Sequence, residues 1–79
     1  MEEEKTAQEY STPDTVLSAY LQTNGIILIR VDKSDQVIHF IFPQPPDGLL
    51  AQFFTGEAEV NLQAFFRNYK DMLKRIHGR

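Results

Sequence analysis

The sequence predicts an α+β domain in which a two-stranded antiparallel hairpin packs on helices, in the order helix, hairpin, helix, helix. Two short β-branched runs flank a polar loop between residues 26 and 42, and three other segments repeat apolar residues at helical spacing. A chain of 79 residues fits one domain. Chains of this size bury only about 60% of the surface that they expose when unfolded, so a deep substrate cavity would remove scarce core volume.

Residues 1–11 are predicted to form a flexible acidic tail, and residues 12–79 the single α+β domain. The first segment is polar and acidic apart from Ala7 and Tyr10. It therefore cannot bury enough apolar surface to offset the conformational entropy lost on ordering.

The first helix is expected at about residues 13–23. Thr12 can cap it, Pro13 suits its first position, and Asp14 complements the positive end of the helix. Its apolar face comprises Val16, Leu17, Tyr20 and Leu21. Gly25 can adopt the left-handed conformation that closes a helix.

The hairpin is predicted from strands at residues 26–31 and 36–42, because Pro43, Pro45 and Pro46 prevent the ladder from continuing. Alternation along each strand sorts the side chains onto two faces. The face predicted to form the core is entirely apolar and comprises Ile27, Ile29, Val31, Ile38, Phe40 and Phe42. The second face comprises Ile26, Leu28, Arg30, Val37, His39 and Ile41.

That second face is mostly apolar, so something is expected to cover it. Either the helices of the same chain cover it, or a second copy or another protein does. In the latter case these six residues form a protein interface, with Arg30 and His39 within it.

A short helix is predicted after Asp47, ending near Thr55 and Gly56, and residues 57–60 could add a short third strand. Asn61 then caps the longest helix, at about residues 62–77. The apolar stripe of that helix comprises Leu62, Phe65, Phe66, Tyr69, Met72, Leu73 and Ile76.

Charge is segregated along the chain. Residues 1–66 contain three basic and ten acidic residues, a net charge of −7, whereas residues 67–79 contain five basic and one acidic residue, a net charge of +4. Arg67, Lys70 and Lys74 recur at helical spacing and are predicted to share a face opposite the stripe of Phe66 and Leu73.

This basic face is a candidate nucleic-acid contact, formed by Arg67, Lys70, Lys74 and Arg75, with Arg30 of the hairpin as a fifth residue. The alternative is a solvated face, because cations near a helix C-terminus complement the macrodipole and Asp71 interrupts the row.

No catalytic, metal or cofactor site is predicted. The absence of cysteine excludes disulfide scaffolds and thiolate metal sites, and His39 and His77 are too few for a zinc site. The glycines lie at predicted helix boundaries, not in a phosphate loop. None of the serines stands beside a positioned base, and Asp32 and Asp35 match turn chemistry.

The start of the sequence, Met1-Glu2-Glu3-Glu4-Lys5, lacks the basic start and apolar stretch of a secretory signal. The apolar run between Gly25 and Arg30 is far shorter than a membrane-spanning helix. We therefore expect a cytoplasmic protein without a membrane span.

Three segments resemble a family of small prokaryotic and viral domains of unknown function. They are Val16-Leu17-Ser18-Ala19-Tyr20-Leu21 running into Gly25, the apolar hairpin, and Phe53-Phe54-Thr55-Gly56 followed by Phe65-Phe66 and Leu73-Lys74. The resemblance spans about residues 12–76 and implies the architecture, with no activity, cofactor or site residue.

The expected function is that of a non-catalytic binding or accessory module that acts through protein contacts, including homodimerisation through the hairpin. The alternative is a small nucleic-acid-binding or regulatory protein that uses the basic C-terminal helix.

Overall fold

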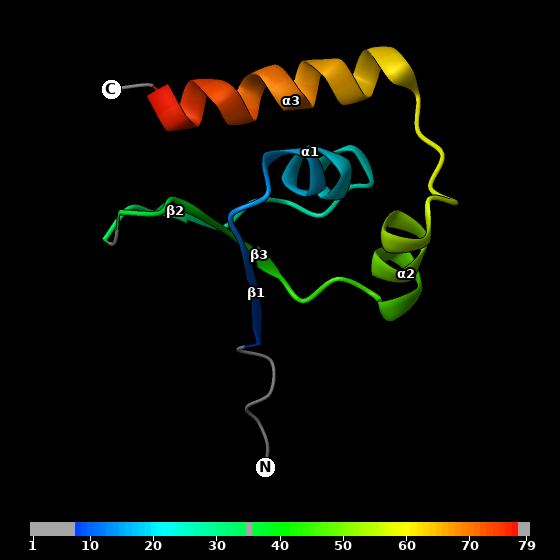
Figure 1. The fold of residues 1–79 in the computed structure, drawn as a ribbon, viewed down its shortest axis with the longest axis horizontal. Helices are drawn as coiled ribbons and strands as arrows, with labels where there is room; N and C mark the ends of the chain where they lie inside the picture. The colour runs from blue at the N-terminus through cyan, green and yellow to red at the C-terminus, as the bar shows by residue number, and fades with distance from the viewer. Residues whose placement is uncertain (1–7, 35, 78–79) are drawn as a thin grey trace.

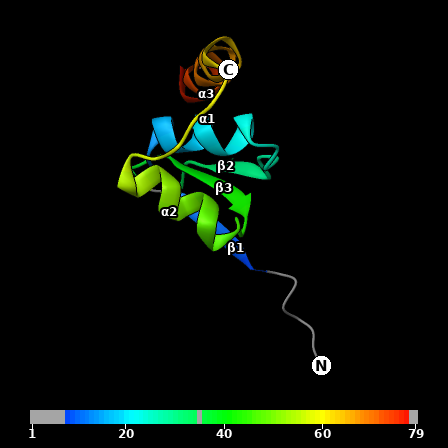
Figure 2. The ribbon, with the colours of Figure 1, turned by 90° about the vertical axis from the view of Figure 1, so that its right-hand side faces the viewer.

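The computed structural model describes residues 8–34 and 36–77 and has an α+β fold, as the sequence predicts (Figure 1). Its elements in chain order are β1 (Glu9–Thr12), α1 (Thr15–Thr23), β2 (Arg30–Asp32), β3 (His39–Pro43), α2 (Asp47–Thr55) and α3 (Leu62–His77). The strands form one antiparallel sheet in the order β1-β3-β2. The sheet, α1 and α3 lie one above the other, with α2 at one end (Figures 1 and 2).

The third strand of the sheet is β1, which lies in the segment predicted as a tail. Tyr10 pairs with Phe42 and Thr12 with Phe40. The predicted tail is therefore wrong for residues 9–11. Gln8 lies in no helix or strand, and residues 1–7 lie outside the described residues. Residues 57–60, suggested as a third strand, form no strand.

The first helix begins two residues later than predicted. Asp14 is its N-cap, and its Oδ1 accepts hydrogen bonds from the backbone N–H groups of Val16 and Leu17 at 2.9 and 3.1 Å. The Thr12 hydroxyl accepts from the N–H of Asp14 at 3.1 Å, so it supports the cap without being it.

The end of α1 explains why the following strand is short. Gly25 has the predicted left-handed backbone, with φ of 87°. The N–H of Gly25 donates to the carbonyl of Gln22 and that of Ile26 to the carbonyl of Leu21, both at 3.0 Å. Ile26 is thus used in closing the helix, and the ladder with β3 begins at Arg30.

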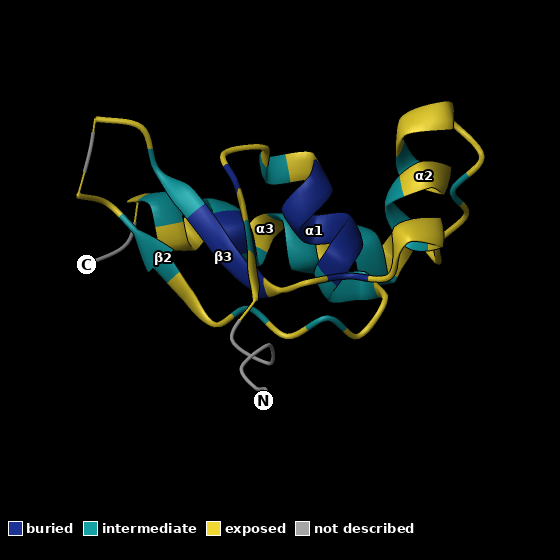
Figure 3. Cartoon of the chain, turned by 90° about the horizontal axis from the view of Figure 1, so that it is seen from below, coloured by how far each residue is buried: buried dark blue, intermediate teal, exposed yellow. Residues whose placement is uncertain are grey.

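The core lies between α1, the inner face of the sheet and α3. Its buried members are Leu17, Ala19, Tyr20, Leu21, Phe40, Phe42 and Met72. Figure 3 shows that burial concentrates in α1 and β3, whereas α2 is largely exposed. The aromatic ring of Tyr20 lies 5.2 Å from that of Phe53 and its hydroxyl donates to the carbonyl of Leu49 at 3.0 Å, which attaches α2 to α1.

The predicted sorting of the hairpin side chains is correct only within the paired strands. Phe40 and Phe42 are buried in the core, and Val31 packs against it. Before β2 the sorting is reversed, because Ile27 and Ile29 are 69% and 48% exposed. Ile26 and Leu28 pack against the core in their place. The prediction failed there because residues 26–29 form no strand.

The other two helices follow local signals. Pro46 occupies the N-cap position of α2 and makes no side-chain hydrogen bond there. Asp47, which was predicted to cap this helix, lies in its first turn instead. Gly56 ends α2 with φ of 83°. α3 has the predicted bounds, and the Asn61 side chain accepts a hydrogen bond from the N–H of Ala64 at 2.9 Å.

Candidate functional site

The helix α3 packs on α1, and α1 separates it from the sheet (Figures 1 and 2). Met72 is the only residue of α3 that is fully buried in the described structure, at 0% exposure. Phe65, Tyr69 and Ile76 are partly buried beside it. These four residues form the contact of α3 with the core.

The predicted apolar stripe of α3 is wider than the surface that α1 covers. Leu62 is 65% exposed and Phe66 is 51% exposed, although both belong to the stripe. Leu73 is half-buried. These three residues recur four and seven positions apart, so they form one row along the helix. We call this row the open flank.

The opposite edge of the α1 contact is polar, and Asn68 and Asp71 on this edge are hydrogen-bonded to α1. The Gln22 amide nitrogen donates to Asn68 Oδ1 at 2.8 Å and to Asp71 Oδ2 at 3.2 Å. The Asn68 amide nitrogen donates to the Thr23 hydroxyl at 3.0 Å. Arg75 Nε donates to Asp71 Oδ2 at 3.1 Å. We call Asn68, Asp71 and Arg75 the pinned flank.

The polar surroundings of Asp71 shift its titration. Partial burial acts to raise the pKa of Asp71, but hydrogen bonds from Gln22 and Arg75 and the positive charges of Arg75 and Lys74 lower it below its ordinary value. The carboxylate is therefore ionised at neutral pH, and its charge is engaged on the pinned flank.

The basic row, Arg67, Lys70 and Lys74, is exposed along α3. It was predicted to lie opposite the stripe of Phe66 and Leu73. Arg67 and Lys74 lie about 100° round the helix from Phe66 and Leu73, whereas Lys70 lies one turn after Phe66, at the edge of the open flank. Arg75 does not extend the row, because it lies on the pinned flank in an ion pair with Asp71.

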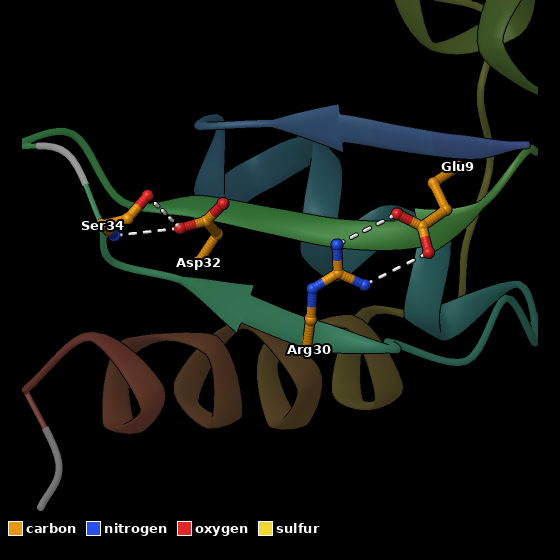
Figure 4. Close-up of polar contacts among 4 residues, drawn as sticks. All are labelled: Glu9, Arg30, Asp32 and Ser34. Carbon is orange, nitrogen blue, oxygen red and sulfur yellow. Dashed lines mark hydrogen bonds and ion pairs between the residues drawn. The ribbon is translucent and has the colours of Figure 1, made fainter.

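Arg30 does not lie with the basic row. It lies on the outer face of the sheet, where two of its guanidinium nitrogens donate to the two carboxylate oxygens of Glu9, each at 3.1 Å (Figure 4). Hydrogen bonding to Glu9 and the charge of Glu9 raise the pKa of Arg30 above its ordinary value. The structure therefore separates this fifth predicted nucleic-acid contact from the other four.

The outer face of the sheet is mostly polar. Arg30 stands directly opposite Ile41 in the ladder, and its ion pair with Glu9 joins the two edge strands across β3 (Figure 4). Ile41 is only 5% exposed, although it lies on this outer face. The bidentate ion pair of Arg30 and Glu9 therefore crosses β3 above Ile41. Ile41 is the one large apolar residue on the outer face of the paired strands.

Beside that pair, Asp32 ends β2. Its Oδ1 accepts hydrogen bonds from the hydroxyl and the N–H of Ser34 at 2.7 and 2.9 Å (Figure 4). These hydrogen bonds lower the pKa of Asp32 below its ordinary value. The arrangement is that of an Asx turn at the start of the hairpin loop.

The six residues of the predicted interface do not form one surface. Arg30, His39 and Ile41 share the outer face of the sheet. Ile26 and Leu28 pack against the core, as described above, and Val37 is 53% exposed in the loop before β3. The predicted apolar second face is therefore not assembled, because only the residues in the ladder obey its alternation.

Within residues 8–34 and 36–77, no group of three histidine or acidic side chains is placed to hold a metal ion. Over the same residues, no helix combines the length and the apolar character needed to cross a membrane. Ser18 is buried, and its hydroxyl donates to the carbonyl of Asp14 at 2.8 Å.

Two features of this site have no local signal in the sequence. The hydrogen bond between Gln22 and Asn68 joins residues 46 positions apart, and neither residue lies in a motif. The exposure of Leu62 and Phe66 follows from how α3 is rotated on α1. The surplus width of the apolar stripe is the one signal in the sequence that pointed to an uncovered edge.

The chain matches a protein family described as Domain of unknown function (DUF5659) over residues 7–78. This match confirms the resemblance to a family of domains of unknown function. Comparison with curated proteins produced no match, and comparison with solved structures produced none either.

Proposed function

The chain belongs to the DUF5659 family, and we propose that this member is a non-catalytic binding module that acts through contact with another protein. The observation that carries the proposal is the open flank of α3. Leu62 and Phe66 are more than half exposed on the longest helix of the fold, beside the half-buried Leu73. Contiguous apolar side chains bordered by polar ones are typical of interaction surfaces.

The outer face of the sheet supports this role less well. Arg30 is paired with Glu9, and Ile41 beneath them is already buried. The apolar residues that would drive association there, Ile26 and Leu28, pack on the core instead. We therefore place the protein contact on α3, and homodimerisation through the hairpin is an alternative outcome of the tests.

Photo-crosslinking from single positions tests the proposal. A photoreactive phenylalanine analogue at position 66 should form an adduct with a protein in cells that express the full chain. The same analogue at position 54 is a matched control, because Phe54 is also an exposed phenylalanine, at 66%. Equal adduct yields at the two positions, or adducts of the chain with itself alone, would count against a contact with another protein through α3.

The second candidate function is binding of nucleic acid through the basic row. It is favoured by the exposure of Arg67, Lys70 and Lys74 along one side of α3. Each phosphate contact should contribute a slope of about −0.9 to the dependence of log affinity on log salt concentration. Filter binding of single- and double-stranded DNA at two salt concentrations measures this slope. Binding that is absent, or unchanged when Lys70 and Lys74 become glutamate, would exclude the candidate.

A further inference from the structure

The open flank and the basic row are two neighbouring features of one helix. Leu62, Phe66 and Leu73 span twelve residues, and the eleven steps from first to last cover about 16 Å along the axis. Lys70 lies one turn after Phe66, and Lys74 lies one turn after Lys70. Amphipathic helices bind other proteins through apolar side chains that recur every one or two turns along one face. Leu62, Phe66 and Leu73 have this spacing, with positive charge beside them.

The charge of this side of α3 indicates the chemistry of the partner. The one acidic residue of α3 is Asp71, which lies on the pinned flank and binds Gln22 and Arg75. The exposed charges that border the open flank, at Lys70 and Lys74, are therefore positive. Complementary charge across an interface directs partner choice, and like charges suppress wrong partners.

Pairing of two copies through this flank is opposed by the same charges. A two-fold interface brings the same patch of both copies together, so Lys70 and Lys74 of both copies would lie at one interface. No acid of α3 on this side offsets that repulsion. The arrangement thus disfavours a second copy as the occupant.

A nucleic acid would use only part of this surface. The basic row offers three exposed cations, whereas Arg75 is paired with Asp71 and Arg30 with Glu9. The chain as a whole has a net charge of −3, which opposes binding to phosphates. The exposed side chain of Leu62 has no polar group that could contact a phosphate backbone.

We propose that the open flank and the basic row together form the docking site for an acidic amphipathic helix of another protein. Its apolar face lies on Leu62, Phe66 and Leu73, and its carboxylates pair with Lys70 and Lys74. This inference rests on the proposed protein-binding role of α3 and specifies the class of partner.

The test uses the full chain and a synthetic helical peptide of about four turns, with leucines on one face and glutamates along both edges. Fluorescence anisotropy should show about tenfold weaker binding when the glutamates are replaced by lysines or when the same residues are scrambled. Amide chemical shifts perturbed by the peptide should map to residues 62–74 of α3.

Matched variants separate charge from general effects. Lys74→Gln should weaken binding of the acidic peptide severalfold, whereas Arg75→Gln, with the same change in net charge, should leave it unchanged because Arg75 lies on the pinned flank. Phe66→Ala should weaken binding about tenfold, and Phe54→Ala should not. Circular dichroism confirms that each variant is folded.

Three outcomes would overturn the inference. They are equal affinity for the acidic and basic peptides, perturbed shifts on the outer face of the sheet, and tighter binding of a DNA oligonucleotide than of the peptide. Sedimentation that shows a dimer abolished by Phe66→Ala would assign the flank to a second copy. A protein adduct from position 66 without binding of the acidic peptide would keep the proposed function and reject only this class of partner.

Discussion

The open flank and the pinned flank lie on the same helix and both border α1, but they differ in their contacts with it. On the pinned flank, Asn68 and Asp71 make hydrogen bonds of defined geometry with α1. On the open flank, Leu62 and Phe66 belong to the apolar stripe but remain exposed. Burial of apolar area is non-directional, whereas hydrogen bonds are directional. We therefore expect the polar contacts to fix the rotation of α3, which leaves the surplus apolar edge exposed.

The largest expected difference in the free energy of unfolding is between Met72, at the centre of the contact with α1, and Phe66, on the open flank. Met72 is 0% exposed, so Met72→Ala should lower the free energy of unfolding by about 2–5 kcal/mol through lost burial and a cavity. Phe66→Ala removes a larger side chain but should cost less than about 1 kcal/mol, because that side chain is half in water. Urea unfolding monitored by circular dichroism measures both. Similar losses would mean that the open flank is part of the core.

An intermediate effect should come from the pinned flank. Asn68→Ala removes two hydrogen bonds to α1, one from the Gln22 amide and one to the Thr23 hydroxyl, and should cost about 1–3 kcal/mol at about 0.5–1.5 kcal/mol for each bond. The Gln22 amide keeps its bond to Asp71, and the Thr23 hydroxyl keeps its bond to the carbonyl of Ala19. Gln63→Ala, on the exposed side of α3, is the control and should be near neutral.

A tryptophan reporter sharpens this second prediction. If the hydrogen bonds set the rotation of α3, Asn68→Leu in a Phe66→Trp background should turn the stripe toward α1 and shift the tryptophan emission to shorter wavelength. Emission unchanged by Asn68→Leu would show that packing alone sets the rotation.

The smallest effect should appear at acidic pH. The pKa of Asp71 lies below its ordinary value of 3.8 in the folded protein, so between the two values the unfolded chain binds more protons. The contribution of Asp71 is therefore complete above about pH 4 and is lost as pH falls through the folded-state pKa. Asp71→Asn should cost about 0.3–0.5 kcal/mol at neutral pH, as for exposed i,i+4 pairs, and flatten the acid limb of the stability curve. Urea titrations from pH 7 to pH 2 compare the two proteins, and parallel acid limbs would contradict the assignment.

The helix boundaries were predictable because their causes are local. Gly25 and Gly56 adopt the left-handed backbone that ends a helix, and Asn61 caps α3 at the predicted place. The antiparallel pairing of the hairpin was also predictable, since a polar loop joins two β-branched runs.

The strand β1 was not predictable by the same reasoning. Only Tyr10 and Thr12 face the core, and the residues between and before them are polar, as expected for an edge strand with one solvated face. Such a pattern resembles a polar tail until its partner is known. The pairing of β1 with β3 joins residues about thirty positions apart, which no local signal reports.

The candidate site shows the same division. The identity of the basic row and the apolar stripe was determined by the sequence, because helical spacing alone groups them. Their relation to the rest of the molecule was decided only by tertiary structure. The Asn68 side chain accepts a hydrogen bond from Gln22 and donates one to Thr23, which ties α3 to α1, and the Glu9 pair holds Arg30 on the far side of the sheet. A local sequence sets what a helix carries, but contacts between distant segments set which of its sides faces water.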